Sequence, residues 1–175
     1  MRLDDLFPNW DFRECHRLRV AASCEATMRA VEEVTWSEVP VFRMLMFTRS
    51  FGKSLPTGEK RIIDSFRTGA YSEIARTDDE LVVGSIIRTT EDNSSTEPYV
   101  VASGEEFATF DKPGYTKIAY NFHWADGRLN TETRVVSTDR SAHRKFTLYW
   151  AAIRLPSGFI RHEWLRAIRR KAEMN

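Results

Sequence analysis

The chain has 175 residues and a formal net charge of +1, with 42% hydrophobic and 29% charged residues. This length suits one domain, residues 1–175, and the near-zero charge gives no electrostatic reason to expect a nucleic-acid partner. The N-terminus lacks the apolar run of a signal peptide, and residues 39–47, the most hydrophobic window, are too few for a membrane span. Two cysteines that make neither a CxxC motif nor a disulfide framework favour reduced thiols, so we expect a cytoplasmic protein. The sequence has no Gly-rich phosphate loop, and we expect no cofactor.

The first part of the chain predicts a strand followed by two short helices. Residues 13–20 alternate polar and apolar side chains, which is typical of a half-buried strand. Ser23 is a good N-cap for a short helix, and Ser37 is a good N-cap for a second helix that ends near Gly52. We therefore expect the order strand, helix, helix.

The middle of the chain predicts short elements separated by polar turns. Residues 62–67 suit one helical turn, and residues 70–76 and 81–88 suit two strands of a hairpin. Residues 99–102 suit a further short strand. Ser103, three positions before a glutamate, has the spacing of a capping box and predicts a brief helix.

The most informative segment is a pair of strands, residues 115–124 and 129–138, joined by an Asp126-Gly127 turn. This turn fixes the register, and the register sorts the side chains onto two faces. One face is apolar and aromatic with some hydroxyls: Ile118, Tyr120, Phe122, Trp124, Leu129, Thr131, Thr133 and Val135. The other face pairs Ala119 with Arg134, Asn121 with Glu132, and His123 with Asn130. We expect an antiparallel sheet whose aromatic face is buried and whose polar face meets water.

Residues 139–172 predict a long C-terminal helix, with Asp139 as its N-cap and a break from Pro156 to Gly158. Its apolar side chains follow a helical stripe: Ala142, Phe146, Tyr149, Trp150 and Ile153, then Ile160, Trp164, Leu165, Ile168 and Ala172. We interpret the basic residues between them as a solvated face: Arg161, Arg166, Arg169, Arg170 and Lys171. Contact of this face with nucleic acid or acidic lipid is the alternative.

Taken together, the elements resemble the helix-grip fold of the START-like (SRPBCC) superfamily, in particular a bacterial branch of it. That superfamily includes pollen allergens, lipid-transfer START domains and aromatic polyketide cyclases. The residues that carry the resemblance are 17–22, 113–115, 121–122, 131–135, 146, 149–150 and 168–170. The resemblance implies an α+β fold in which a curved antiparallel sheet wraps around the C-terminal helix, often with an apolar cavity between them.

The aromatic face and the helix stripe together predict a pocket for an apolar or aromatic small molecule. The candidate ligand-binding residues are Phe42, Met46, Tyr120, Phe122, Thr131, Thr133, Tyr149, Trp150 and Ile153. The alternatives are an enzyme of the cyclase or dehydratase kind that uses the same cavity, or an interaction module whose core is filled. The sequence favours binding, because it shows no catalytic signature and no obvious titratable group on the inward face.

Other polar residues have simpler interpretations. Asn121, Glu132 and Arg134 would form an active-site cluster only if the register were shifted, and we interpret them as a polar ladder that faces solvent. Arg88 could meet an anionic ligand, but a surface charge is the simpler interpretation. The four histidines lack metal-ligand spacing, so we predict no metal site and no catalytic residues.

Overall fold

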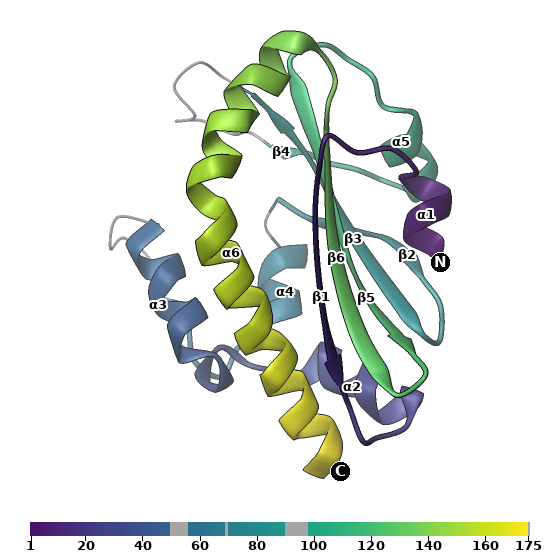
Figure 1. The fold of residues 1–175 in the computed structure, drawn as a ribbon, viewed down its shortest axis with the longest axis vertical. Coiled ribbons are helices and arrows are strands. Elements are labelled where there is room, and N and C mark those ends of the chain that lie inside the picture. The colour runs from purple at the N-terminus through teal and green to yellow at the C-terminus, as the bar shows by residue number, and fades with distance from the viewer. Residues whose placement is uncertain (50–55, 69, 90–97, 175) are drawn as a thin grey trace.

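The computed structural model describes residues 1–49, 56–68, 70–89 and 98–174. It is an α+β fold in which a long C-terminal helix lies across one face of an antiparallel sheet (Figure 1), as the sequence predicts. The elements in chain order are α1 (Arg2–Leu6), β1 (Phe12–Arg19), α2 (Cys24–Glu33), η1 (Trp36–Glu38), α3 (Pro40–Arg49), α4 (Ile62–Arg67), β2 (Ser72–Arg76), β3 (Glu80–Arg88), β4 (Pro98–Tyr99), α5 (Gly104–Thr109), β5 (Tyr115–Ala125), β6 (Arg128–Ser137) and α6 (Arg140–Met174).

The strands of the described chain form one sheet in the order β1-β6-β5-β3-β2, in which neighbouring strands are antiparallel. The short strand β4 pairs with Ile86 and Ile87 of β3, beyond the part of β3 that pairs with β2. The predicted hairpin of β2 and β3 is therefore confirmed, and so is a strand at Tyr99, although it begins at Pro98 and is shorter than expected.

The register predicted for β5 and β6 is confirmed. Ile118 pairs with Val135, and Tyr120 pairs with Thr133. The turn between the strands has φ of 50° at Asp126 and 69° at Gly127. Two successive positive φ values match the twist of a two-residue hairpin, which is why an Asp-Gly pair predicts the register so well.

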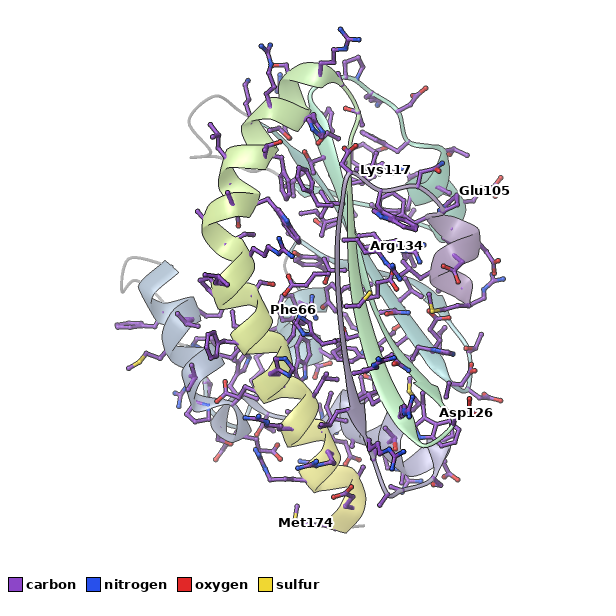
Figure 2. The ribbon with its side chains drawn as sticks, viewed as in Figure 1. Phe66, Glu105, Lys117, Asp126, Arg134 and Met174 are labelled. Carbon is purple, nitrogen blue, oxygen red and sulfur yellow. The ribbon has the colours of Figure 1, made fainter. Side chains whose placement is uncertain are left out.

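On one face of the sheet, α2, α3, α4 and α6 close the main core. Trp164 of α6 lies at its centre, with Phe122 of β5 and Phe42 of α3 at ring distances of 4.8 Å and 5.7 Å. Figure 2 shows Phe66 between α6 and the sheet, where its ring stacks on Trp164 at 5.7 Å. The aromatic face thus meets the helix stripe, as the sequence predicts.

The opposite face of the sheet is covered as well, which overturns one prediction. Asn121, Glu132 and Arg134 do not face solvent: they are only 0%, 8% and 2% exposed. The short helix α1, absent from the sequence prediction, packs with α5 over this face and forms a second apolar core. Figure 2 shows Arg134 on the side of the sheet that faces α1.

Arg134 donates hydrogen bonds to β6, to α1 and to the residue that follows α1. Its Nε donates to Glu132 at 2.6 Å, its Nη2 donates to Asp4 at 2.5 Å, and its Nη1 donates to the Phe7 carbonyl at 2.7 Å. Arg13 binds the same Glu132 carboxylate with two hydrogen bonds of 2.7 Å and 2.9 Å. The register predicted for β5 and β6 is correct, but the alternation of polar and apolar side chains does not reveal that α1 and α5 cover the polar face.

Glu80 of β3 connects α1 to the sheet through hydrogen bonds. Its carboxylate accepts hydrogen bonds from the backbone N–H of Arg2 at 2.5 Å and from the side-chain amide of Asn121 at 2.6 Å. A carboxylate at the first turn satisfies free N–H groups there and offsets their positive partial charge. The position of α1 therefore depends on residues far away in the sequence.

The C-terminal helix differs from its prediction in one respect. α6 runs unbroken from Arg140 to Met174 with Pro156 inside it, rather than breaking from Pro156 to Gly158. Figure 1 shows the helix bowed across the sheet. Asp139 caps it as predicted, accepting from the backbone N–H of Ser141 at 2.7 Å and of Ala142 at 2.9 Å.

Capping residues predicted three of the earlier helix starts, and two of these predictions are correct. Ser23 and Ser103 accept hydrogen bonds from the third backbone N–H of α2 and α5, each at 3.1 Å, and α4 matches the predicted turn. Ser37, however, lies inside η1, and α3 begins at Pro40. The free N–H groups of α3 are instead bound by Glu163 of α6, at 2.6 Å for Phe42. The predicted end near Gly52 lies outside the described residues.

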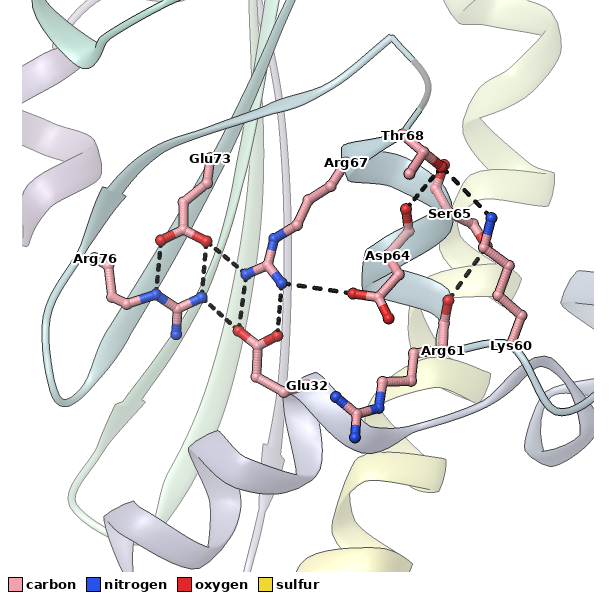
Figure 3. Close-up of polar contacts among 9 residues, drawn as sticks. All are labelled: Glu32, Lys60, Arg61, Asp64, Ser65, Arg67, Thr68, Glu73 and Arg76. Atoms are coloured by element: carbon pink, nitrogen blue, oxygen red, sulfur yellow. Dashed lines mark hydrogen bonds and ion pairs between the residues drawn. The ribbon is translucent and has the colours of Figure 1, made fainter.

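An ion-pair network joins α2, α4 and β2 at the side of the main core (Figure 3). Arg67 of α4 donates to both carboxylate oxygens of Glu32, at 2.9 Å and 3.0 Å, and to Glu73 at 2.5 Å. Arg76 bridges the same two carboxylates. These hydrogen bonds lower the pKa of Glu32 against the opposing effect of its burial, so the network holds three elements as charged groups.

Candidate ligand-binding site

A cavity of about 700 Å³ lies between the sheet and the first two-thirds of α6. Its walls are mainly apolar and aromatic, with hydroxyl groups and two arginines among them. The described lining is Leu45, Met46, Phe66, Ala70, Tyr71, Ser85, Ile87, Arg88, Thr89, Ile118, Tyr120, Thr133, Val135, Phe146, Tyr149, Trp150, Ile153, Pro156, Ser157, Ile160, Arg161 and Trp164. This volume lies in the range that small-molecule sites occupy.

The cavity lies along the middle of α6, between the packed C-terminal end of the helix and Phe146, which is buried near its N-terminal end. Near its C-terminal end, α6 buries Trp164, Leu165 and Ile168 against the sheet and α2. Toward its N-terminal end, Trp150 and Ile153 are only partly buried and line the open space instead. The aromatic stripe therefore has two roles: one half is core, and the other half is cavity wall.

The structure brings together six of the nine predicted site residues. These six line the cavity: Met46, Tyr120, Thr133, Tyr149, Trp150 and Ile153. Phe42, Phe122 and Thr131 are not among the lining residues; they are 3%, 0% and 1% exposed, and the first two pack on the ring of Trp164. For these three residues, the alternative of a filled core is the correct one.

A group of polar atoms lies at the inner end of the cavity, next to Trp164. The Arg161 guanidinium lies over the Tyr120 ring, 4.2 Å from its centroid, and donates to the Thr133 hydroxyl at 3.2 Å. Burial raises the pKa of Tyr120 and lowers the pKa of Arg161. Tyr120 is consequently a neutral phenol at neutral pH, whereas arginine keeps its charge because its ordinary pKa is so high.

No family model, curated protein or solved structure matched the chain in three comparisons. The geometry of the cavity therefore carries the functional argument.

Arg161 is the principal site residue that sequence reasoning misplaced. It was assigned to a solvated basic face, yet it points into the cavity. The spacing held a signal: Arg161 follows Trp150 by eleven residues, which is close to three turns of a helix, so both share a face. Because arginine is usually exposed, its residue type outweighed its position.

Two other residues of the predicted basic face contact η1. Lys171 makes an ion pair with Glu38 at 3.0 Å, and Arg170 donates to the Glu38 carbonyl at 3.2 Å. They hold η1 against the end of α6, while Arg166 is exposed. Arg88, interpreted as a surface charge, is exposed and also borders the cavity.

Within residues 1–49, 56–68, 70–89 and 98–174, no group of three or more His, Cys, Asp or Glu side chains is arranged to hold a metal ion. Among the helices of those same segments, none combines the length and apolarity that crossing a bilayer requires.

Proposed function

We propose that this chain binds an apolar or aromatic small molecule in the cavity between the sheet and α6. The observation that carries the proposal is a cavity of about 700 Å³ whose walls are mostly aromatic and aliphatic. A ligand that binds this site in the folded state and not in the unfolded chain would stabilise the fold. Trp150, Ile153 and Phe146 would provide one wall, and Ile118 with Val135 the other.

We also propose that the chain is a START-like protein and acts in the cytoplasm. The support for the family is the order of elements and the packing of α6 against the antiparallel sheet. Cys15 and Cys24 are both free thiols, which is typical of a reducing compartment.

An enzyme of the cyclase or dehydratase kind is the second candidate, and one observation favours it. Within residues 1–49, 56–68, 70–89 and 98–174, the buried Tyr120 hydroxyl has no hydrogen-bond partner, and Tyr120 lines the cavity, where it could donate a proton or a hydrogen bond. Binding ranks first because the described lining supplies no carboxylate or imidazole to act as a general base beside it.

Titration with the neutral dye N-phenyl-1-naphthylamine tests the binding proposal. The dye should gain fluorescence with the folded protein at micromolar concentration, and the double variant Ile118→Trp/Ile153→Trp should weaken its affinity at least fivefold by filling the cavity. Leu148→Trp is the matched control, because Leu148 lies on the outer face of α6 with 78% of its surface exposed. Absence of dye binding to the wild type would refute the proposal, as would an equal loss in the control.

A further inference from the structure

Arg161 brings an unpaired charge into the cavity. Its Nη2 donates to Thr133 at 3.2 Å, and the ring of Tyr120 faces its Cζ at 4.2 Å, but its Nη1 is buried without a hydrogen-bond partner among the described residues. An arginine side chain has five N–H donors in a planar fork, so one bond to a neutral hydroxyl leaves most of them unused. Leaving buried donors unused costs free energy.

The charge on Arg161 also lacks an acid within ion-pair distance in the described part of the chain. The carboxylate that interacts with the Arg161 charge from a longer distance is that of Glu14. Glu14 belongs to β1 and pairs with Thr133 of β6. Glu14 Oε1 is bound to His16 Nε2 at 2.8 Å, and its Oε2 is buried without a partner of its own. A buried cation is costly unless an anion lies in direct contact with it.

Three further polar atoms around the same cavity have no hydrogen-bond partner in the described part of the chain. The hydroxyl groups of Ser85 and Tyr120 and the indole N–H of Trp164 are all buried and unbonded in the structure, and all three residues line the cavity. Each of these groups can donate a hydrogen bond, as Arg161 does. A cavity with several unused donors and a positive charge is suited to an acceptor that carries negative charge.

We propose that the ligand of this cavity is an amphipathic molecule whose carboxylate binds Arg161. This inference rests on the proposed function and adds the chemical class of the ligand. A guanidinium forms two parallel hydrogen bonds with a carboxylate, which matches the free side of Arg161. The apolar part of the ligand then extends toward Phe146, about four helical turns or roughly 22 Å along α6. A fatty acid or an aromatic carboxylic acid has this form.

A pair of probes with the same chain tests the head group. Dodecanoate and 1-dodecanol, both below their aggregation limits at pH 7.5, compete with N-phenyl-1-naphthylamine for the wild-type protein. The acid should displace the dye at a concentration at least tenfold lower than the alcohol does. Equal displacement by the two probes would overturn the inference and leave the proposed function standing, whereas absence of dye binding would remove the proposed function itself.

Variants at Arg161 test whether the carboxylate of the ligand binds this residue. Arg161→Met should bring the acid and the alcohol to within twofold of each other, each measured as displacement of the dye from the same variant. Arg161→Lys should keep part of the preference, because the charge remains but the fork is lost. If Arg161→Met does not fold, the Lys variant decides alone: an unchanged preference for the acid would overturn the assignment to Arg161.

The matched control is Arg166→Met, on the exposed face of the same helix. It removes the same charge five residues away and should keep the full preference for the acid. A preference that survives in Arg161→Met, or one that disappears in Arg166→Met, would show that surface charge rather than the cavity selects the acid.

Discussion

Arg134 and Arg161 lie on opposite sides of the sheet, and their surroundings differ in one respect. Arg134 donates to two carboxylates and a carbonyl and stacks on Trp10, with its Cζ 4.6 Å from the ring centroid. Arg161 also stacks on an aromatic ring, but its only described hydrogen bond goes to a hydroxyl. A fully bonded buried cation is typical of a structural role, whereas an incompletely bonded one beside a cavity is typical of a binding role.

Glu132, the main partner of Arg134, should make stability depend on pH. Burial would raise its pKa, but hydrogen bonds from Arg13 and Arg134 outweigh burial and hold the pKa at about 2. Because the folded-state pKa is depressed, the stabilisation is complete above the unfolded-state pKa of about 4.3 and is lost as pH falls toward 2. The shift corresponds to about 3 kcal/mol at most.

Urea unfolding at several pH values between 7 and 2.5 measures this contribution. The wild type should lose stability steeply below pH 4.5, and Glu132→Gln should lose less over the same interval. At pH 7 the variant should already be weaker by about 3 kcal/mol, since Arg134 then lacks its main anion. Parallel stability curves for the two proteins would show that Glu132 is not ionised through contact with the arginines.

At the scale of elements, the long helix α6 shows how packing overrides a local signal. Proline inside a helix removes one backbone hydrogen bond and usually bends or breaks the helix. In α6, the segments on both sides of Pro156 are held by buried side chains: Phe146 before the proline, and residues from Trp164 to Ala172 after it. The carbonyl of Ala152, which loses its partner, belongs to an exposed residue and can bind water. The sequence shows the proline but not this anchoring, so a break was predicted where the helix continues.

Pro156→Ala should therefore stabilise the protein by about 1–2 kcal/mol. Alanine restores the missing hydrogen bond and has the highest helix propensity, and both effects stabilise the helix. A smaller destabilising effect arises because the unfolded chain gains conformational entropy when proline is replaced. Urea unfolding with detection by far-ultraviolet circular dichroism measures the change. Gly158→Ala, also inside α6, is a useful comparison because it raises helix propensity without restoring a bond, although its methyl group would lie 3.1 Å from Glu14. Destabilisation by Pro156→Ala would mean that the bow at Pro156 is needed for packing against the sheet.

Other elements could be predicted because their signals are local. The Asp126-Gly127 turn fixed the register of β5 and β6, and Ser23, Ser103 and Asp139 marked helix starts through their own hydrogen bonds. α1 could not be predicted in this way. It spans five residues, and its first N–H groups are satisfied by Glu80, from another part of the chain.

At the scale of the whole molecule, periodicity predicts which side chains share a face but not how much space lies between faces. Tyr120 and Phe122 point to the same side of β5, yet Tyr120 borders the cavity and Phe122 is packed. The difference comes from what lies opposite them, including Phe66 and Tyr71, whose positions no local pattern sets. Six of the nine site residues could be placed in this way, and Arg161 could not.

The second core makes the N-terminal segment part of the fold rather than an appendage. Leu3 and Phe7 are 0% and 4% exposed, and Phe7 packs edge-on against Phe107 at 5.2 Å. Removal of residues 1–10 would expose this core and take the Asp4 carboxylate and the Phe7 carbonyl from Arg134. Each large apolar side chain contributes about 1.5–3 kcal/mol when buried, so the truncation should cost at least about 3 kcal/mol.

Urea unfolding of the truncated chain, together with Leu3→Ala as a milder change, tests the role of this segment. Leu3→Ala should cost about 2–5 kcal/mol, while Asp5→Asn, at an exposed position of α1, should change stability by less than about 0.5 kcal/mol. Amide hydrogen exchange should speed up first in β3 and β5, which α1 contacts. Because the cavity lies on the other face of the sheet, truncated protein that remains folded should still bind the neutral dye. Equal urea midpoints for the truncated and complete chains would show that the second core contributes nothing to stability. The sheet would then tolerate the exposure of Arg134 to water.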